Sequence, residues 1–376
     1  MIYKEFKGKM LSALGMGCMR FPTYGEDKTI DEAKTAEMFD YAIKNGINYF
    51  DTAWGYHDGK SEPMVGKLLE KYPRESFYLA SKFPGYAQAN WGKAEEIFAK
   101  QLERCRVDYF DFYLIHNVTE SNIDAYLDDN YGDVMYFVKM KEEGKIKHLG
   151  FSTHGTLETM HRFLDKYSQY MEFCQLQINW LDYSFQNAKA KIEMMKEYGN
   201  IPVWVMESVR GGKLATLEEA YAKQLQAHRE DESIPAWAFR FIQSLPEVCV
   251  TLSGMSDFEQ VKANINTFSE EKPLNKEEWD TLMSIADSMV GKKTLFCTGC
   301  SYCTTHCAMG LDIPRIIELY NEHVFSDGGF IAPMALSTFP EDKLPSACIG
   351  CTACEEVCPQ NIKISEMMSD FAAKLK

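Results

Sequence analysis

The chain has 376 residues, a hydrophobic fraction of 45% and a charged fraction of 25%, the composition of a globular protein with a sizeable core. The formal net charge of −15 and the lack of a Lys/Arg-rich run argue against nucleic acid and anionic membranes as partners. No apolar signal segment opens the sequence and no stretch has about 18 consecutive apolar residues, so we expect a cytoplasmic protein whose cysteines do not form a disulfide framework.

Short apolar runs alternate with amphipathic stretches from the N-terminus to about residue 270. We expect strands at 11–19, 47–51, 77–82, 110–116, 146–152, 173–179, 201–207 and 247–253. The expected helices are 35–45, 62–71, 94–104, 134–143, 157–166, 188–198, 234–244 and 258–268. This alternation predicts a parallel sheet with right-handed crossovers, and eight units of this kind fit a closed (β/α)8 barrel.

A doubly wound α/β sheet is the rival architecture for this segment. Its dinucleotide-binding fingerprint is missing, because the segment Gly15 to Arg20 has no third glycine and opens no helix. We therefore expect a barrel domain over residues 1–290, followed by a smaller domain over residues 291–376.

Ionisable residues end three consecutive predicted strands. They are Asp51, Lys82 and His116, and Tyr56 follows Asp51 in the next loop. Catalytic residues of a barrel lie at the carboxyl ends of its strands, so these side chains are expected to face one mouth. Each residue alone is also compatible with an ordinary role, such as a turn cap for Asp51 or a core histidine for His116. The set favours a functional site.

The barrel segment resembles the aldo-keto reductase family over roughly residues 10–270. The resemblance is carried by the runs Asn48 to Tyr56, Ser81-Lys82, Leu114 to His116, Gly150 to Ser152, Gln175 to Asn179, and Ser253 to Ser256 with the following stretch to Asn264. It implies reduction of an aldehyde or ketone, or oxidation of the alcohol, by hydride transfer with NADPH or NADH. Tyr56 would supply the proton, Lys82 would lower the phenol pKa, Asp51 would hold Lys82, and His116 would orient the carbonyl.

The same resemblance implies a set of nucleotide contacts. They are Ser152, Thr153, Gln175, Met206, Ser253, Gly254, Met255, Gln260 and Asn264. Thr153 stands where an asparagine is usual, and Met206 where many relatives place an aromatic ring. Gln260 stands where relatives that prefer NADPH often carry arginine. Without that cation a 2′-phosphate is poorly compensated, so we expect a weak preference for NADPH or use of NADH.

The 12 cysteines fall into two classes. Cys18, Cys105, Cys174 and Cys249 are scattered among apolar neighbours and read as small core residues. The other eight form two motifs of spacing C-x2-C-x2-C-x3-C, and each cysteine of the first has a counterpart 51 residues later. The motifs are Cys297, Cys300, Cys303, Cys307 and Cys348, Cys351, Cys354, Cys358.

Three thiolates spaced in this way can hold one face of a four-iron, four-sulfur cube, while the fourth ligates the other cube. One cluster would be held by Cys297, Cys300, Cys303 and Cys358, and the other by Cys348, Cys351, Cys354 and Cys307. Zinc suits the pattern poorly, since its paired ligands are usually well separated. The segment resembles a bacterial two-cluster ferredoxin domain, and a helical pattern over 313–324 favours its helical form.

Hydride transfer moves two electrons and a cluster passes one, and no flavin fingerprint is visible in the sequence. Three interpretations follow. The protein is a reductase whose clusters exchange electrons with a ferredoxin or flavoprotein, a reductase with structural or oxygen-sensing clusters, or a nicotinamide-binding auxiliary subunit with little turnover. The small carbonyl or alcohol substrate is not identified by the sequence. Tyr86, Trp91, Trp180 and Tyr183 suggest either a planar or apolar substrate or simple loop packing.

Overall fold

The computed structural model describes residues 1–25 and 29–376. These divide into two units, one from Met1 to Met283 and one from Ser284 to Lys376. The division falls inside a long helix, α12 (Lys276–Lys293), slightly before the domain boundary expected at residue 290. That boundary stays a prediction, because a helix shared by both units gives it no sharp position.

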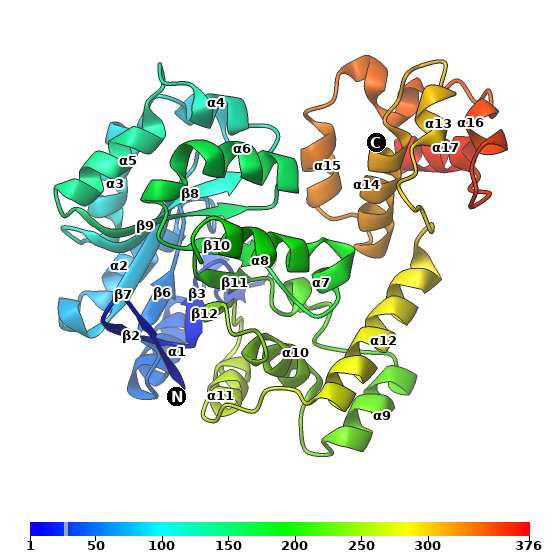
Figure 1. Ribbon diagram of the computed structural model, residues 1–376. Helices are drawn as coiled ribbons and strands as arrows, with labels where there is room; N and C mark the ends of the chain where they lie inside the picture. The colour runs from blue at the N-terminus through cyan, green and yellow to red at the C-terminus, as the bar shows by residue number, and fades with distance from the viewer. Residues whose placement is uncertain (26–28) are drawn as a thin grey trace. The chain divides into compact units, whose positions relative to one another are not determined.

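The first unit is a closed barrel of parallel strands (Figure 1). Its strands are β3 (Leu14–Gly17), β6 (Tyr49–Asp51), β7 (Tyr78–Phe83), β8 (Phe110–Val118), β9 (Ile146–Thr153), β10 (Cys174–Gln177), β11 (Val203–Met206) and β12 (Val248–Ser253). Neighbours follow chain order, and the barrel closes where β12 pairs with β3 through Thr251 and Leu14. The predicted (β/α)8 barrel is confirmed.

The predicted first strand, 11–19, is wrong in its extent. It divides into β2 (Lys9–Ser12) and β3. β2 pairs antiparallel with β1 (Tyr3–Phe6) in an N-terminal hairpin, and only β3 enters the barrel. The alternation of apolar residues continues through both pieces, so the sequence pattern did not show where the chain changes partner.

A helix follows each barrel strand and covers the outside of the barrel (Figure 1). These helices are α1 (Glu32–Lys44), α2 (Ser61–Leu69), α3 (Ala94–Cys105), α5 (Asp133–Glu142), α6 (Leu157–Tyr167), α8 (Ala188–Glu197), α10 (Ile234–Gln243) and α11 (Phe258–Thr267). Side chains cap several of them, as Asp257 does when it accepts a hydrogen bond from the backbone of Gln260 at the start of α11. All eight correspond to predicted helices.

Among the described residues, three further helices lie in connections between barrel elements where the sequence predicted no helix, and they are α4 (Ile123–Leu127), α7 (Asp182–Phe185) and α9 (Glu219–His228). The barrel interior is filled by large side chains, among them Tyr49, Phe112 and Trp204, each with no exposed surface. A filled interior fixes the strand ends rigidly, so side chains that project from those ends keep a defined geometry.

The second unit is helical. It contains α13 (Tyr302–Thr305), α14 (Ile313–Phe325), α15 (Ile331–Leu336), α16 (Ala353–Glu356) and α17 (Ile364–Lys374). The helix predicted over 313–324 is confirmed as α14. Helices α13 and α14 recur 51 positions later as α16 and α17, so the repeat of the cysteine motifs is also a repeat of structure. Its core includes Cys303 and Cys354 together with Ile316, Met368 and Phe371.

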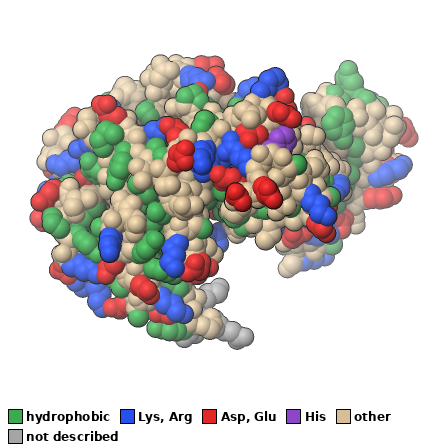
Figure 2. All heavy atoms as spheres, turned by 90° about the horizontal axis from the view of Figure 1, so that it is seen from below, with side chains coloured by type: hydrophobic (Ala, Val, Ile, Leu, Met, Phe, Trp, Pro, Cys, Tyr) green, Lys and Arg blue, Asp and Glu red, His purple; other side chains and the backbone are tan. Residues whose placement is uncertain are grey.

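Charged side chains of both signs are interspersed on the face drawn in Figure 2. Several are paired on the barrel exterior, for example Lys71 with Asp40 at 2.5 Å, and such exposed pairs each contribute only about 0–1 kcal/mol. Within the described residues, no helix has both the length and the apolar composition to cross a bilayer.

Candidate active site

Asp51, Lys82 and Tyr56 meet at the carboxyl ends of the barrel strands. Asp51 ends β6, Lys82 lies one residue before the end of β7, and Tyr56 lies in the loop between β6 and α2. The ammonium Nζ of Lys82 lies 2.5 Å from Asp51 Oδ1 and 3.4 Å from Tyr56 Oη. It also donates to the carbonyl oxygen of Thr52 at 2.8 Å. These partners offset the cost of burying the Lys82 ammonium, which has no exposed surface.

His116 completes this group from β8. The centroid of its ring lies 6.2 Å from that of Tyr56, with the rings edge to face. Its Nδ1 atom is buried and has no hydrogen-bond partner in the structure. Leaving a buried polar atom unpaired costs about 1–3 kcal/mol, and such atoms are tolerated where a ligand pairs with them. The structure thus brings the three side chains predicted from the strand ends, together with Tyr56 from the following loop, to one mouth.

The protonation states follow from burial and from Lys82. Burial raises the pKa of Tyr56, and the nearby ammonium of Lys82 offsets only part of that rise. Lys82 thus lowers the Tyr56 pKa as expected, but the net shift is upward because burial, which the sequence did not show, outweighs it. Burial also lowers the pKa of His116 well below its ordinary value of 6.5, and Lys82 and His154 lower it further. At neutral pH, Tyr56 therefore keeps its proton and His116 is uncharged.

Lys82 and Asp51 form a buried ion pair. Burial acts to lower the pKa of Lys82, but attraction to Asp51 and Tyr56 outweighs it and the pKa is raised. Burial raises the pKa of Asp51, against the attraction of Lys82. The short contact between the two groups and the further bond from Lys82 to Thr52 favour the ionised form of both.

Two predicted nicotinamide contacts lie side by side on β9 and β10, where Ser152 is in register with Gln175. The Gln175 side chain donates to the Met206 sulfur at 3.5 Å, while its Oε1 atom is buried without a partner. This oxygen suits the amide N–H of a nicotinamide, so the residues present fit the cofactor. Thr153 differs, because its hydroxyl donates to the backbone of Val118 and accepts from that of Gly155.

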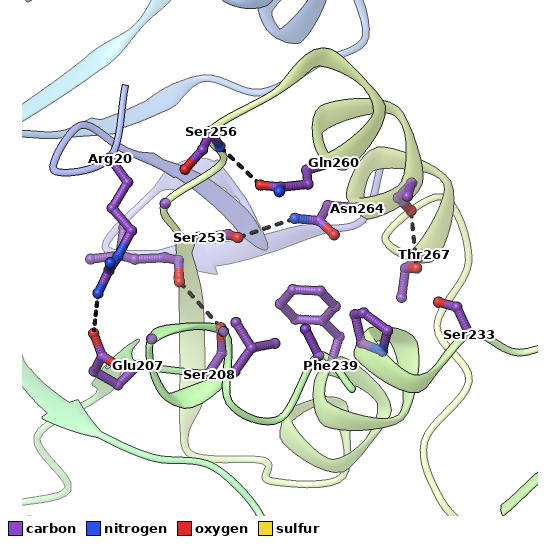
Figure 3. Close-up of a pocket in the computed structure, with 18 residues that line it drawn as sticks. Arg20, Glu207, Ser208, Ser233, Phe239, Ser253, Ser256, Gln260, Asn264 and Thr267 are labelled. Atoms are coloured by element: carbon purple, nitrogen blue, oxygen red, sulfur yellow. Dashed lines mark hydrogen bonds and ion pairs between the residues drawn. The ribbon is translucent and has the colours of Figure 1, made fainter. Parts of the chain in front are cut away.

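A cavity of about 300 Å³ opens between the ends of β11 and β12 and helix α11 (Figure 3). Four of the predicted nucleotide contacts line it, namely Ser253, Gly254, Gln260 and Asn264. Asn264 donates to the Ser253 hydroxyl at 3.1 Å, which fixes both side chains at the cavity wall (Figure 3). Met255 is not part of the lining, and its side chain is buried.

Sequence reasoning missed the opposite wall of this cavity. Arg20 follows β3, its stem lies about 3.2 Å from the position of a Cβ atom built on Gly254, and its guanidinium forms an ion pair with Glu207 at 3.7 Å (Figure 3). Phe239 of α10 and Ser208 also line the cavity. One signal was available, because a charged residue directly after a barrel strand belongs to the functional end of the fold.

The four aromatic residues named from the loops fall into two groups. Tyr86 packs edge-on against His116 with ring centroids 5.4 Å apart, so it lies at the candidate site. Trp91 donates to the backbone of Gly85, Trp180 is buried, and Tyr183 packs on Phe241. For these three, the structure supports loop packing.

The second unit holds the eight motif cysteines. Cys307, Cys348, Cys351 and Cys354 line a single cavity. These are the four thiols that the spacing assigned to one cluster, although they come from both motifs. In the described residues, no three or more Cys, His, Asp or Glu side chains are close enough to hold one metal ion. A four-iron cube needs a wider spread of thiolates, because each thiolate binds a different iron, and the shared cavity fits that requirement.

Backbone geometry around the two motifs repeats with the sequence. Gly299 and Ser301 adopt positive φ angles of 68° and 62°, and their counterparts Gly350 and Thr352 adopt 70° and 58°. The resulting turns direct backbone N–H groups toward sulfur, as from Gly299 to Cys297 at 3.5 Å. A second such bond runs from the N–H of Leu311 to Cys307 at 3.4 Å. The four scattered cysteines are all buried, as predicted for core residues.

Comparison with known proteins places both units. Residues 13–287 match the model of the aldo/keto reductase family, and residues 296–362 match that of a 4Fe-4S dicluster domain. The uncharacterized oxidoreductase YqkF of Bacillus subtilis is 25% identical over 309 residues, which cover 73% of this chain and 92% of that protein. The NADH-specific methylglyoxal reductase of Escherichia coli is 24% identical over 303 residues, covering 68% and 89%.

Probable aldo-keto reductase 1 of Glycine max is 33% identical over 155 residues, which cover 39% of this chain and 42% of that protein. Among solved structures, the holo form of aldo-keto reductase AKR11C1 from Bacillus halodurans gives a TM-score of 0.56 at 25% identity and covers 74% of this chain and 93% of that one. These matches agree with the barrel and the cysteine-lined second unit described above. The chain therefore belongs to the aldo/keto reductase family and carries a 4Fe-4S dicluster domain after its barrel.

Proposed function

We propose that the protein reduces an aldehyde or ketone with NAD(P)H, or oxidises the corresponding alcohol, with Tyr56 as the proton donor. The observation that carries this proposal is the position of Lys82 Nζ between Asp51 Oδ1 and Tyr56 Oη, beside an uncharged His116. This arrangement offers a protonated phenol, a fixed cation next to it and a neutral imidazole with an unpaired ring nitrogen. A carbonyl oxygen that gains negative charge needs these groups around it.

A reduced nicotinamide, when bound, supplies the hydride to the carbonyl carbon. As the carbonyl π electrons move to oxygen, Tyr56 transfers its phenolic proton to that oxygen and the product is an alcohol. Lys82 stabilises the tyrosinate left behind, and Asp51 keeps the ammonium in place. His116 is uncharged, and its role is to orient the carbonyl oxygen toward Tyr56. Solvent then returns a proton to Tyr56.

The nucleotide is proposed to lie along the cavity of Figure 3, with its carboxamide at Ser152 and Gln175. The unpaired Oε1 of Gln175 supports that placement. Ser253, Gly254 and Asn264 would line the adenosine phosphate and ribose, and Met206 would face the nicotinamide ring. Met255 and Thr153 would contribute through their backbone, because the Met255 side chain is buried and the Thr153 hydroxyl is already paired.

Transfer of a deuterium label tests the proposed reaction. Anaerobically prepared protein given NAD(P)H that carries deuterium at the transferred position, with a panel of aldehydes and ketones, should place one deuterium on the former carbonyl carbon. Mass spectrometry of the product alcohol measures this directly. Nucleotide binding without a labelled alcohol from any carbonyl would contradict the proposal and favour an auxiliary, nucleotide-binding role.

Gln260→Arg should raise the affinity for NADPH by roughly tenfold to a hundredfold and leave that for NADH nearly unchanged. The Gln260 amide accepts from the N–H of Ser256 and donates to Asp257, so the charged group beside Gln260 in these contacts is a carboxylate. An arginine fork pairs with a 2′-phosphate, and charge-assisted hydrogen bonds contribute about 1.5–3 kcal/mol. Fluorescence titration with both nucleotides measures the effect.

The matched control is Gln260→Met, which removes the amide and adds no charge. It should change the affinities for the two nucleotides by similar factors. If Gln260→Arg raises the affinity for both nucleotides equally, or for neither, the 2′-phosphate does not lie against α11 and the proposed orientation of the nucleotide is wrong.

The second unit is proposed to hold two [4Fe-4S] clusters on the eight motif cysteines. One would be bound by Cys307, Cys348, Cys351 and Cys354, which share a cavity. The other would be bound by Cys297, Cys300, Cys303 and Cys358, whose backbone follows the same turns. Clusters at these sites would pass single electrons to or from an external ferredoxin or flavoprotein. We propose the domain division at residues 290 and 291.

A further inference from the structure

The loop that carries Tyr56 is strained. His57, Asp58 and Gly59 adopt positive φ angles of 51°, 55° and 82° in succession, although only the last is glycine. Backbone of this kind persists only where surrounding contacts determine it. Since Tyr56 directly precedes these residues, whatever holds the loop also sets the position of the phenol.

Arg104 of α3 contacts this loop. Its guanidinium carbon lies 3.8 Å from the centroid of the Trp54 ring, the distance of a close cation–π contact. The same guanidinium lies 3.9 Å from the position that a Cβ atom would take on Gly59. The group therefore contacts the loop on both sides of Tyr56.

A buried carboxylate holds Arg104 in this position. Glu62, which has no exposed surface, accepts from Arg104 Nη1 through its Oε2 atom at 3.2 Å. Its Oε1 atom accepts from Ser81 at 2.7 Å and from Gln101 at 2.6 Å. Gln101 also donates to the carbonyl oxygen of Lys82 at 3.0 Å. One continuous network thus joins the support of the Tyr56 loop to the backbone of Lys82.

We propose that Arg104 is a positioning residue that holds Tyr56 Oη against Lys82 Nζ, acting through Trp54 and anchored by Glu62. The inference rests on the proposed role of Tyr56. Arg104 belongs to the outer ring of helices and acts on the reaction through the residues that it holds, not by contact with a substrate. A guanidinium is suited to this task because one face stacks on the indole while its edge pairs with the carboxylate.

The test compares Arg104→Met with the wild-type holoprotein. Methionine keeps much of the apolar stem but removes the stacking cation, so we expect kcat to fall tenfold to about a hundredfold, as for a misplaced catalytic group. NAD(P)H affinity should stay within about twofold, because Arg104 does not line the nucleotide cavity. Arg104→Lys keeps a charge beside Glu62 but loses the planar contact with Trp54, so it should give an intermediate kcat. If the methionine variant folds poorly, the lysine variant replaces it in the test.

Arg74→Met is the matched control. Arg74 has comparable exposure and partners at the opposite end of the barrel: its side chain is 24% exposed, compared with 23% for Arg104, and it pairs with the buried Asp111 at 2.6 Å. Its guanidinium carbon lies 4.0 Å from the ring centroid of Tyr109. Arg74 also donates to the backbone carbonyls of Phe77 and Tyr109, so Arg74→Met should cost at least as much stability as Arg104→Met. If they lower kcat equally per folded molecule, Arg104 has only a structural role and the proposal is wrong.

A titration without turnover separates this inference from the proposed reaction. Tyrosinate absorbance is followed against pH in proteins with and without the Tyr56→Phe substitution. The difference between the two curves gives the pKa of Tyr56. The measurement is made once in the wild-type background and once in the Arg104→Met background. Burial is the largest cause that raises this pKa, so a released loop should let it fall toward the ordinary value of about 10. An unchanged pKa would overturn the role of Arg104 even if Tyr56 is the proton donor. If the pKa of Tyr56 is lower in Arg104→Met but the wild type makes no labelled alcohol, the positioning role of Arg104 stands and the proposed reaction is wrong.

Discussion

Tyr56→Phe is expected to lower kcat for carbonyl reduction by roughly a hundredfold to ten-thousandfold, the usual contribution of a general acid. Phenylalanine keeps the ring that packs against His116 and that lies 4.9 Å from the ammonium of Lys82, so the mouth retains its shape. It removes only the proton that the product oxygen requires. Steady-state kinetics measure the loss, and fluorescence titration should show NAD(P)H affinity within about twofold of wild type.

Tyr86→Phe provides the comparison, because it removes a hydroxyl from the second tyrosine that packs on His116. The fall in kcat for Tyr86→Phe should be far smaller than that for Tyr56→Phe. Wild-type activity should also fall on the alkaline side, where Tyr56 loses the proton that it must donate, and this limb should lie at high pH because burial raises the Tyr56 pKa. If Tyr56→Phe turns over like wild type, or Tyr86→Phe loses as much, Tyr56 is not the proton donor.

The sequence predicted the barrel well because its strands are covered on both sides. The stretch 110–116 is apolar apart from Asp111 and His116, and the observed β8 is buried along nearly all of that length. In a barrel of parallel strands all carboxyl ends lie at one mouth, so the sequence alone predicts that Asp51, Lys82 and His116 lie together. The cysteine spacing was equally local, since turns and ligands recur at fixed intervals.

Contacts between distant segments could not be predicted in the same way. Arg20 reaches Glu207 only because the barrel closes between β12 and β3, which brings together residues from opposite ends of the domain. Burial raises the pKa of Tyr56 and the Lys82 ammonium lowers it, so the net shift depends on how deeply Tyr56 is buried. The depth of burial is a property of the packed barrel mouth, not of the local sequence. The support of the loop by Arg104 likewise needs the packing of α3 beside α2. Periodicity locates these helices but does not show which side chains meet between them.

Cys354→Ala should remove one cluster and leave the other. Cys354 is buried and lines the cavity that Cys307, Cys348 and Cys351 also line. Anaerobic wild-type protein should contain about eight irons and the variant about four, as measured by iron and sulfide analysis together with the visible absorbance. Because cluster binding contributes to folding, the second unit should also become more sensitive to protease. The control is Cys249→Ala, a buried thiol in β12 that should leave the iron content unchanged.

Cys307→Ala decides how the two motifs share their ligands. Cys307 follows Cys303 in sequence but shares its cavity with the cysteines of the second motif. If each motif lends its last cysteine to the other cube, Cys307→Ala should give the same electron paramagnetic resonance spectrum as Cys354→Ala, and the double variant should lose no further iron. Cys303→Ala should remove the other signal. If Cys307→Ala instead matches Cys303→Ala, each motif binds its own cluster, and the cavity between the two halves of the repeat has another explanation.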